Sequence, residues 1–146
     1  MDAAETARRC AERMYADDAA SQALGITISD VAPGTAIASM KVRDDMVNGH
    51  GICHGGYIFT LADTAFAFAC NTYDDVTVAA GADISFLEPV RQDVELMATA
   101  VELSRRGRSG LYDVTVRTSD GTVVAEFRGR SRSLGRALLN DGLRDT

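Results

Sequence analysis

Cysteine, histidine and long apolar runs are scarce in this sequence of 146 residues, and each scarcity argues against a class of protein. The three cysteines, Cys10, Cys53 and Cys70, are an odd number at irregular spacing, which predicts no disulfide framework and favours a reducing cytoplasm. No apolar run approaches the roughly 20 residues that a membrane span needs, and the first residues do not have the pattern of a secretory signal. We therefore expect a cytoplasmic protein that has no membrane partner.

Positive charge is also limited, because the chain has 15 Lys and Arg against 21 Asp and Glu, a net charge of −6. Binding to nucleic acid relies on neutralising phosphates, so this balance predicts no nucleic-acid partner. The arginines nevertheless form two clusters, one at Arg105, Arg106 and Arg108 and one at Arg128, Arg130 and Arg132. Either cluster suits the phosphates of a small ligand or a solvated surface.

The hydrophobic pattern predicts a single α+β domain over residues 1–146. Helical spacing of apolar residues predicts helices at about 3–16 and at 55–71. Runs rich in β-branched residues predict strands at 26–31, 35–42, 76–87, 94–103, 111–118 and 122–134. The tail at about 136–146 has little pattern, and we expect it to fray. This order of elements predicts an antiparallel sheet of five to six strands wrapped around one long central helix.

The helix at 55–71 is apolar on nearly every side, which predicts that it is buried on most sides. Asp63 lies in the middle of it, where an isolated charge is costly. A carboxylate kept in such a place is a candidate catalytic group.

A glycine-rich segment, Asn48-Gly49-His50-Gly51-Ile52-Cys53-His54-Gly55-Gly56, leads into this helix and continues as a motif to Asn71. The motif resembles the PaaI branch of the hotdog thioesterases, the enzymes of phenylacetate degradation. Further similarity lies at Arg13-Met14-Tyr15, Leu24-Gly25-Ile26, Phe86-Leu87-x-Pro89 and Phe127-x-Gly129. The resemblance implies the hotdog fold, hydrolysis of an acyl-CoA without a further cofactor, and assembly as a homodimer or homotetramer.

The residues themselves suggest how such a reaction would run. Gly55 begins the helix, where backbone N–H groups lack acceptors and the helix dipole is positive. A thioester carbonyl placed there would be polarised, and the oxyanion formed on attack would be stabilised. Asp63 would then act as general base on a water molecule or attack the carbonyl itself.

The spacing of these two residues predicts a site built from two chains. Gly55 and Asp63 are eight positions apart, which is about 12 Å along a helix. One helix therefore does not bring both to a single carbonyl carbon. Two antiparallel copies related by a two-fold axis would place Gly55 of one chain near Asp63 of the other, as the resemblance also implies.

Other site residues follow from the resemblance and from position. His54 either orients the loop near the thioester or caps the helix; Asn48 positions the carboxylate or the water, and Thr64 assists by hydrogen bonding. Substrate contacts are expected from Gly56, Phe59, Arg106 and Arg108, with the two arginines near the CoA nucleotide. The acyl group is expected to be aromatic, of the phenylacetyl or hydroxyphenylacetyl kind, because the helix also supplies Phe66 and Phe68.

Several other readings of the sequence are weaker. His50, Cys53 and His54 are too few for a zinc site, since the chain has only two histidines, so we expect no metal. Cys53 and His54 are adjacent, which is unfavourable for a nucleophile and its base. An enoyl-thioester hydratase of the same fold, or an acyl-CoA-binding module without catalysis, are the alternatives that remain open.

Overall fold

The computed structural model describes residues 1–139. Two helices, α1 (Ala3–Asp17) and α2 (Ala19–Ala23), precede the strands β1 (Thr27–Ala32) and β2 (Thr35–Lys41). A 3-10 turn, η1 (Asp44–Met46), and the long helix α3 (Gly55–Cys70) come next. The remaining strands are β3 (Thr77–Phe86), β4 (Glu95–Arg106), β5 (Ser109–Thr118) and β6 (Val123–Ser133).

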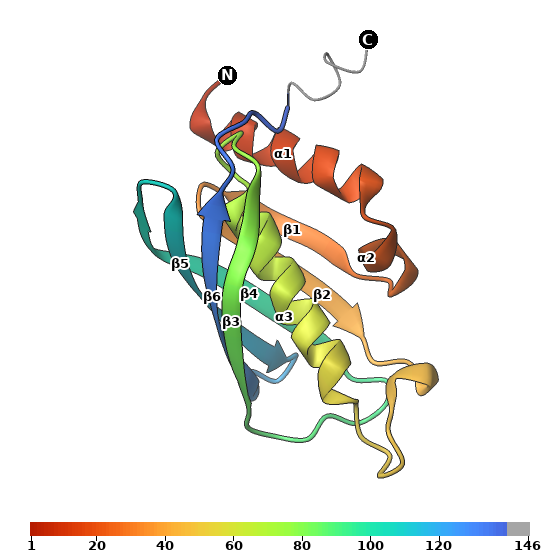
Figure 1. Ribbon diagram of the computed structural model, residues 1–146. Coiled ribbons are helices and arrows are strands. Elements are labelled where there is room, and N and C mark those ends of the chain that lie inside the picture. Colours follow the sequence, from red (N-terminus) through yellow and green to blue (C-terminus); the bar gives the residue numbers. More distant parts are fainter. Residues whose placement is uncertain (140–146) are drawn as a thin grey trace.

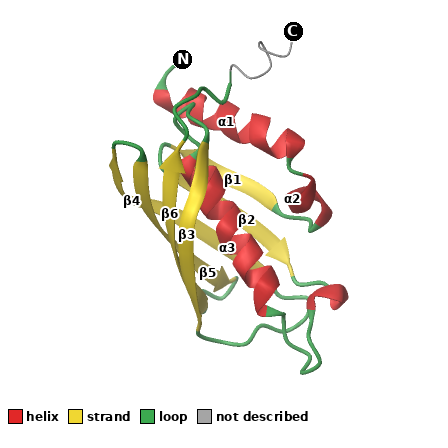
Figure 2. Cartoon of the chain, in the orientation of Figure 1, coloured by secondary structure: helices red, strands yellow, loops and turns green. Residues whose placement is uncertain are grey.

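All six strands form one antiparallel sheet in the order β1-β2-β4-β5-β6-β3. The helix α3 lies across one face of this sheet, and α1 lies near the end at which α3 finishes (Figures 1 and 2). The hotdog arrangement expected from the sequence is therefore confirmed. Within residues 1–139, no helix is both long enough and apolar enough to cross a membrane.

Local chemistry explains the ends of the helices. Asp2 caps α1, because its carboxylate accepts a hydrogen bond of 2.8 Å from the backbone N–H of Glu5. Asn71 ends α3 and joins it to β3: its amide donates to the carbonyls of Ala67 and Thr77, and its oxygen accepts from the N–H of Thr77, all at 2.9 Å. These contacts fix the direction in which the chain leaves α3 and enters the sheet.

The side of α3 that faces the sheet forms the core. Its buried side chains meet the alternating inward residues of the strands, and they are Ile58, Leu61, Ala62, Ala65, Phe66, Phe68, Ala69 and Cys70. Gly129 allows the closest approach, since a side chain there would lie 2.7 Å from the ring of Phe66. The position of α3 over the sheet is thus set by close packing.

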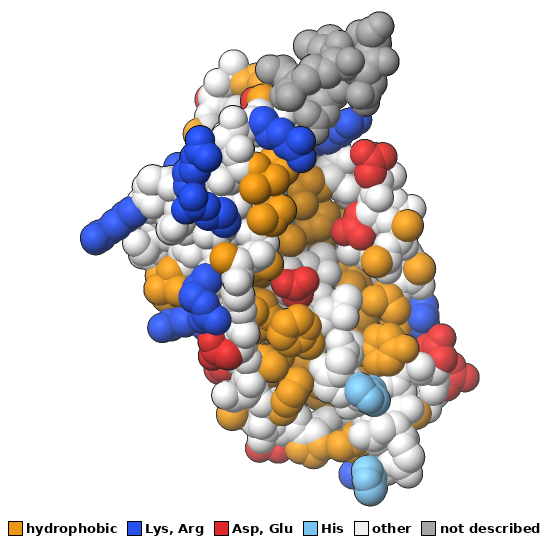
Figure 3. All heavy atoms as spheres, viewed as in Figure 1, with side chains coloured by type: hydrophobic (Ala, Val, Ile, Leu, Met, Phe, Trp, Pro, Cys, Tyr) orange, Lys and Arg blue, Asp and Glu red, His pale blue; other side chains and the backbone are white. Residues whose placement is uncertain are grey.

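The opposite side of α3 is left open, which the sequence did not predict. A stripe of the helix at Gly56, Phe59, Thr60, Asp63 and Ala67 is exposed or only half-buried. Hydrophobic side chains gather over this open side and beside β3 (Figure 3). The sheet packs against one side of the helix instead of surrounding it, so the expected burial on most sides holds only for the sheet-facing side.

Two further details differ from the sequence expectations. The strand β4 runs on to Arg106, so that Gly107-Arg108 alone forms the turn to β5, with Gly107 at φ +58°. The beginning of the tail is held in place: the N–H of Val76 donates to the carbonyl of Arg136, and Leu138 is buried. The rest of the tail that we expected to fray, 140–146, lies outside the described residues.

Candidate active site

At the start of α3, the backbone N–H of Gly55 is left without an acceptor among the described residues. His54 is the N-cap: its Nδ1 accepts from the N–H of Gly56 at 3.0 Å, and its carbonyl accepts from the N–H of Tyr57 at 3.0 Å. The N–H of Gly55 has no acceptor among residues 1–139. His54 therefore has the capping role that the sequence left open, and Gly55 keeps a free donor at the positive end of the helix dipole.

Asn48 organises the loop that precedes the helix. Its side-chain oxygen accepts from the N–H of His50 at 2.9 Å and of Ile52 at 3.4 Å, and its carbonyl accepts from Gly51 at 3.0 Å. The side-chain NH2 of Asn48 has no acceptor within the described part of the chain, so two further N–H donors are available beside the helix start.

Asn48 and Gly55 line the same pocket, which has a volume of about 320 Å³. One wall of the pocket is the glycine-rich loop, and the other is the connection between β3 and β4. A hydrogen bond of 2.7 Å from the N–H of Cys53 to the carbonyl of Val90 joins the two walls. Apolar residues dominate the lining. The wall on the side of β3 and its connection to β4 consists of Phe86, Leu87, Glu88, Pro89 and Val90. An apolar pocket with a few convergent donors is typical of a ligand site.

Asp63 is the carboxylate on the open stripe of α3. It is half-buried, and its side chain has no hydrogen-bond or ion-pair partner in residues 1–139. Burial raises the pKa of Asp63 above the ordinary aspartate value. A carboxylate that lacks such partners retains its capacity to accept a proton.

The chain does not bring Asp63 to the pocket at its own helix start. Asp63 is absent from the pocket lining, two turns further along the regular helix that begins at Gly55. Thr64, beside it, faces the core and donates its hydroxyl proton to the carbonyl of Thr60 at 2.7 Å. Within one chain, the free donor and the carboxylate therefore lie apart.

The phenylalanines of α3 divide into two groups. Phe66 and Phe68 belong to the core, where Phe66 contacts the rings of Tyr112 and Phe127. Phe59 lies on the open stripe with an exposed fraction of 36%, and its ring packs 5.4 Å from that of Phe127. Of these three side chains, only Phe59 is placed to meet a ligand that lies along α3.

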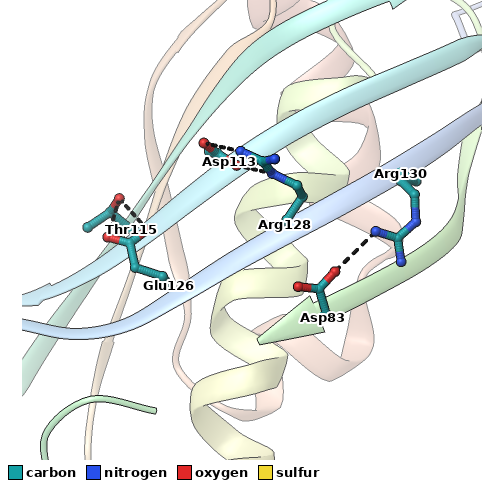
Figure 4. Close-up of polar contacts among 6 residues, drawn as sticks. All are labelled: Asp83, Asp113, Thr115, Glu126, Arg128 and Arg130. Carbon is teal, nitrogen blue, oxygen red and sulfur yellow. Dashed lines mark hydrogen bonds and ion pairs between the residues drawn. The ribbon is translucent and has the colours of Figure 1, made fainter. Parts of the chain in front are cut away.

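The two arginine clusters differ in what they already bind. Arg128 donates twice to Asp113, at 2.7 and 3.0 Å, and Arg130 donates to Asp83 at 3.1 Å, on the sheet face turned away from α3 (Figure 4). For Arg106, Arg108 and Arg132 the described residues supply no carboxylate partner. Within the two clusters, the arginines that lack a carboxylate partner among residues 1–139 therefore lie at the turn between β4 and β5 and beside it.

This turn lies at the end of the molecule opposite to the start of α3 (Figure 1). The sheet register places Arg106 beside Ser109, Ser109 beside Arg132, and Arg132 beside Val78 at the start of β3. Gly55 instead contacts Phe86, the last residue of β3. Arg106 and Arg108 are thus separated from Gly55 of the same chain by the length of β3, which is about 30 Å for an extended strand of this length.

The thiol of Cys53 is not a nucleophile in this arrangement. Cys53 is buried, its sulfur lies 3.6 Å from the carbonyl of His54, and burial raises the pKa of Cys53 to about 11. The thiol is therefore protonated at neutral pH and lacks the electropositive surroundings that activate cysteines.

A larger hollow of about 1160 Å³ lies between α1 and β1, but it contains none of the expected site residues. Among the charged residues that line it, Arg8 forms exposed ion pairs with Glu5 and Glu12. The smaller pocket at the helix start is therefore the candidate active site, because of the donors that line it and not because of its volume.

Sequence reasoning missed the contribution of the connection between β3 and β4 to this pocket. Phe86-Leu87-x-Pro89 was noted only as part of a resemblance, and no role was assigned to it. The available signal was two large apolar residues, Phe86 and Leu87, immediately before the Glu88-Pro89 turn, at a place where a turn is expected to be polar.

Comparison with known proteins agrees with the fold and with the expected class of enzyme. The family described as the thioesterase superfamily matches residues 50–125. The acyl-coenzyme A thioesterase PaaI of Escherichia coli K12 is 40% identical over 131 residues, which cover 90% of this chain and 94% of that protein. The structure of the E. coli PaaI protein, from the phenylacetic acid degradation operon, gives a TM-score of 0.91 over 93% of this chain and 99% of that one.

A variant of the phenylacetic acid degradation protein PaaI from Thermus thermophilus is also similar, with 36% identity and a TM-score of 0.75 over 78% of this chain and 97% of that one. The chain therefore belongs to the thioesterase superfamily. Within that superfamily, the resemblance to the PaaI branch is confirmed, and with it the expectation of a thioesterase.

Proposed function

We propose that the protein hydrolyses the thioester of an acyl-CoA, with the carbonyl oxygen bound by the free N–H of Gly55. The observation that carries this proposal is the unsatisfied donor at the positive end of α3, facing an apolar pocket next to the free amide of Asn48. A donor aimed at a developing oxyanion is the largest catalytic contribution in many acyl-transfer enzymes. The activity of the E. coli relative is of the same kind.

Asp63 supplies the second half of the reaction. As a general base, its carboxylate takes a proton from water while the water oxygen attacks the thioester carbon. The oxyanion forms on the carbonyl oxygen; the C–S bond then breaks, and the proton returns from Asp63 to the departing CoA sulfur. As a nucleophile, Asp63 would instead attack the thioester carbon and expel CoA as its thiolate, which takes a proton from solvent; water would then hydrolyse the acyl anhydride, releasing the acid and restoring the carboxylate. Its raised pKa favours proton acceptance in the first route.

The carboxylate and the donor meet in a homodimer. Among residues 1–139, the strand β3 is an edge of the sheet and pairs only with β6, and it lies beside the open, partly apolar stripe of α3. Sheet edges and exposed apolar faces of this kind are normally covered by a partner. A two-fold axis near the middle of β3 places Asp63 of one chain against the helix start of the other, and two such dimers would form a homotetramer.

The same axis explains the distant arginines. It brings the start of β3 in one chain beside the end of β3 in the other, so Arg106 and Arg108 of one chain approach Gly55 of its partner. CoA is long enough to connect a thioester at the helix start with phosphates at these arginines. The guanidinium groups, which lack carboxylate partners, suit such phosphates.

The acyl group that we propose is aromatic, of the phenylacetyl or hydroxyphenylacetyl kind. Two PaaI relatives are named for phenylacetic acid degradation, and they match most of the chain. Phe59, on the open stripe, offers a ring to such a substrate. We place the reaction in the cytoplasm, where the three free thiols would remain reduced.

Release of free thiol from a panel of acyl-CoA substrates tests this function. The wild-type protein should release CoA with rates that depend on the acyl group, and Asp63→Asn should lose about two to four orders of magnitude in turnover. Hydration of an enoyl-CoA without thiol release would support the hydratase instead. Stoichiometric binding of acyl-CoA without turnover of any substrate would support the binding module.

A further inference from the structure

The backbone of Gly55 at the start of α3 is contacted by a side chain that no part of the proposed mechanism uses. A side chain built on Gly55 would lie 3.0 Å from Cζ of Phe86 and 3.4 Å from both neighbouring ring carbons. The far edge of the Phe86 ring therefore points at the backbone of Gly55. Phe86 also lines the pocket that contains Asn48.

Phe86 differs from the other phenylalanines of the chain. The sequence has five, and four of them pack against another aromatic ring, namely Phe59, Phe66, Phe68 and Phe127. Phe86 has no aromatic neighbour among residues 1–139, and 53% of it is exposed. Burial in the core does not account for a large ring at this position.

The backbone around Phe86 is fixed, although its ring is exposed. Phe86 is the last residue of β3, and the next two residues donate backbone hydrogen bonds to the carbonyl of Val124, Leu87 at 2.8 Å and Glu88 at 3.4 Å. The ring is thus held beside the helix start by a strand end whose backbone is fixed by hydrogen bonds. Specificity residues are most precise when they are carried on rigid elements.

We propose that Phe86 is a specificity-determining residue that contacts the acyl group next to the thioester carbonyl. This inference rests on the function proposed above. A carbonyl that accepts from the Gly55 N–H lies in the pocket that Gly55 and Phe86 both line, and the ring edge lies beside Gly55, so the first atoms of the acyl group meet the ring. When an aromatic acyl group binds, the Phe86 ring exchanges its contact with Gly55 for an edge-to-face or offset contact with the ring of the substrate. A straight alkyl chain does not provide such a contact.

The test compares kcat/KM for phenylacetyl-CoA and hexanoyl-CoA in the wild-type protein and four variants. In Phe86→Ala the ratio of kcat/KM for phenylacetyl-CoA to kcat/KM for hexanoyl-CoA should fall by roughly tenfold, as expected for the loss of one aromatic contact. Phe86→Tyr should keep the wild-type ratio, and Phe86→Leu should lie between. Met97→Ala is the matched control, since Met97 is an exposed apolar residue on β4, away from the pocket, and its ratio should not change.

An unchanged ratio in Phe86→Ala, with both rates lowered equally, would assign the ring to structure and overturn the inference while the thioesterase function stands. If Phe86→Ala does not fold, an unchanged ratio in Phe86→Leu has the same meaning. A wild-type protein that releases no thiol from any acyl-CoA would instead overturn the proposed function, and this inference with it.

Discussion

A carboxylate on an apolar helix costs folding free energy, and Asp63 has no hydrogen bond among residues 1–139 to offset that cost. Active sites commonly retain such residues because their reactivity depends on the same unfavourable surroundings. His54 shows the opposite case, since its ring is used to cap the helix and so leaves Gly55 with a free donor. His54 thus stabilises the helix start, whereas the proposed chemistry depends on Asp63.

Asp63→Asn should raise the melting temperature at pH 7 while it strongly lowers turnover. The pKa of Asp63 is raised in the folded state, so the folded protein binds this proton more readily than the unfolded chain does. The charged form therefore weakens folding above the ordinary aspartate pKa of about 4, and the wild-type protein gains relative stability as the pH falls toward that value. Thermal unfolding of both proteins between pH 4 and 8 measures the difference, which should shrink at the acid end.

Asp83→Asn is the control for this experiment, because Asp83 is an exposed aspartate that is paired with Arg130. It should not raise the melting temperature at pH 7. A lower melting temperature for Asp63→Asn at pH 7 would show that the carboxylate makes a stabilising contact.

Replacing Arg106 and Arg108 by alanine should raise KM for acyl-CoA more than it lowers kcat. These arginines would bind the remote phosphates, which are held alike in the ground and transition states. A truncated thioester without the nucleotide should be hydrolysed equally by both proteins. Arg128→Ala provides the control, since Arg128 is already engaged by Asp113 and should leave KM unchanged. Equal losses on full-length and truncated substrates would give Arg106 and Arg108 a structural role.

At the scale of elements, the connection from α3 to β3 depends on one buried amide. Asn71 is 4% exposed, and three of its hydrogen bonds link the last turn of the helix to the first residue of the strand. Asn71→Ala should lower the free energy of unfolding by about 2 kcal/mol, because it leaves buried backbone groups without partners. Chemical denaturation measures this loss.

Gln22→Ala is a suitable comparison, since Gln22 also bonds a backbone carbonyl, that of Tyr15 at 2.6 Å, but on an exposed surface. Gln22→Ala should lower the free energy of unfolding by no more than about 0.5 kcal/mol. If the two variants proved equally stable, the buried amide would not be what holds α3 to β3.

The elements could be predicted from the sequence to a large extent, and the contacts between them could not. Apolar spacing at 55–71 and β-branched runs after it indicated α3 and four of the strands, because these patterns are local. The ring of Phe86 over Gly55 joins residues 31 positions apart, and no local pattern reports such a contact. The open stripe of α3 was also missed, since apolar composition alone does not distinguish a core from a surface that a second chain covers.

At the scale of the whole molecule, a single chain carries every part of the proposed catalyst but does not assemble it. Gly55 and Asn48 lie at one end, Asp63 lies along the open stripe, and Arg106 and Arg108 lie at the other end. A two-fold axis beside β3 would bring all of them together across the interface. The central claim is therefore that each active site uses two chains.

Mixed dimers of two inactive variants test this claim most directly. Gly55→Pro removes the N–H donor at a helix position that tolerates proline, and Gly55→Ala, which keeps the donor, is its control. Chains with Gly55→Pro and chains with Asp63→Asn are unfolded and refolded together, and thiol release is measured. Each mixed dimer then has one site with both groups intact, so about one quarter of the wild-type activity should return. No recovery in mixtures that contain mixed dimers would contradict the shared site and place donor and carboxylate in one chain.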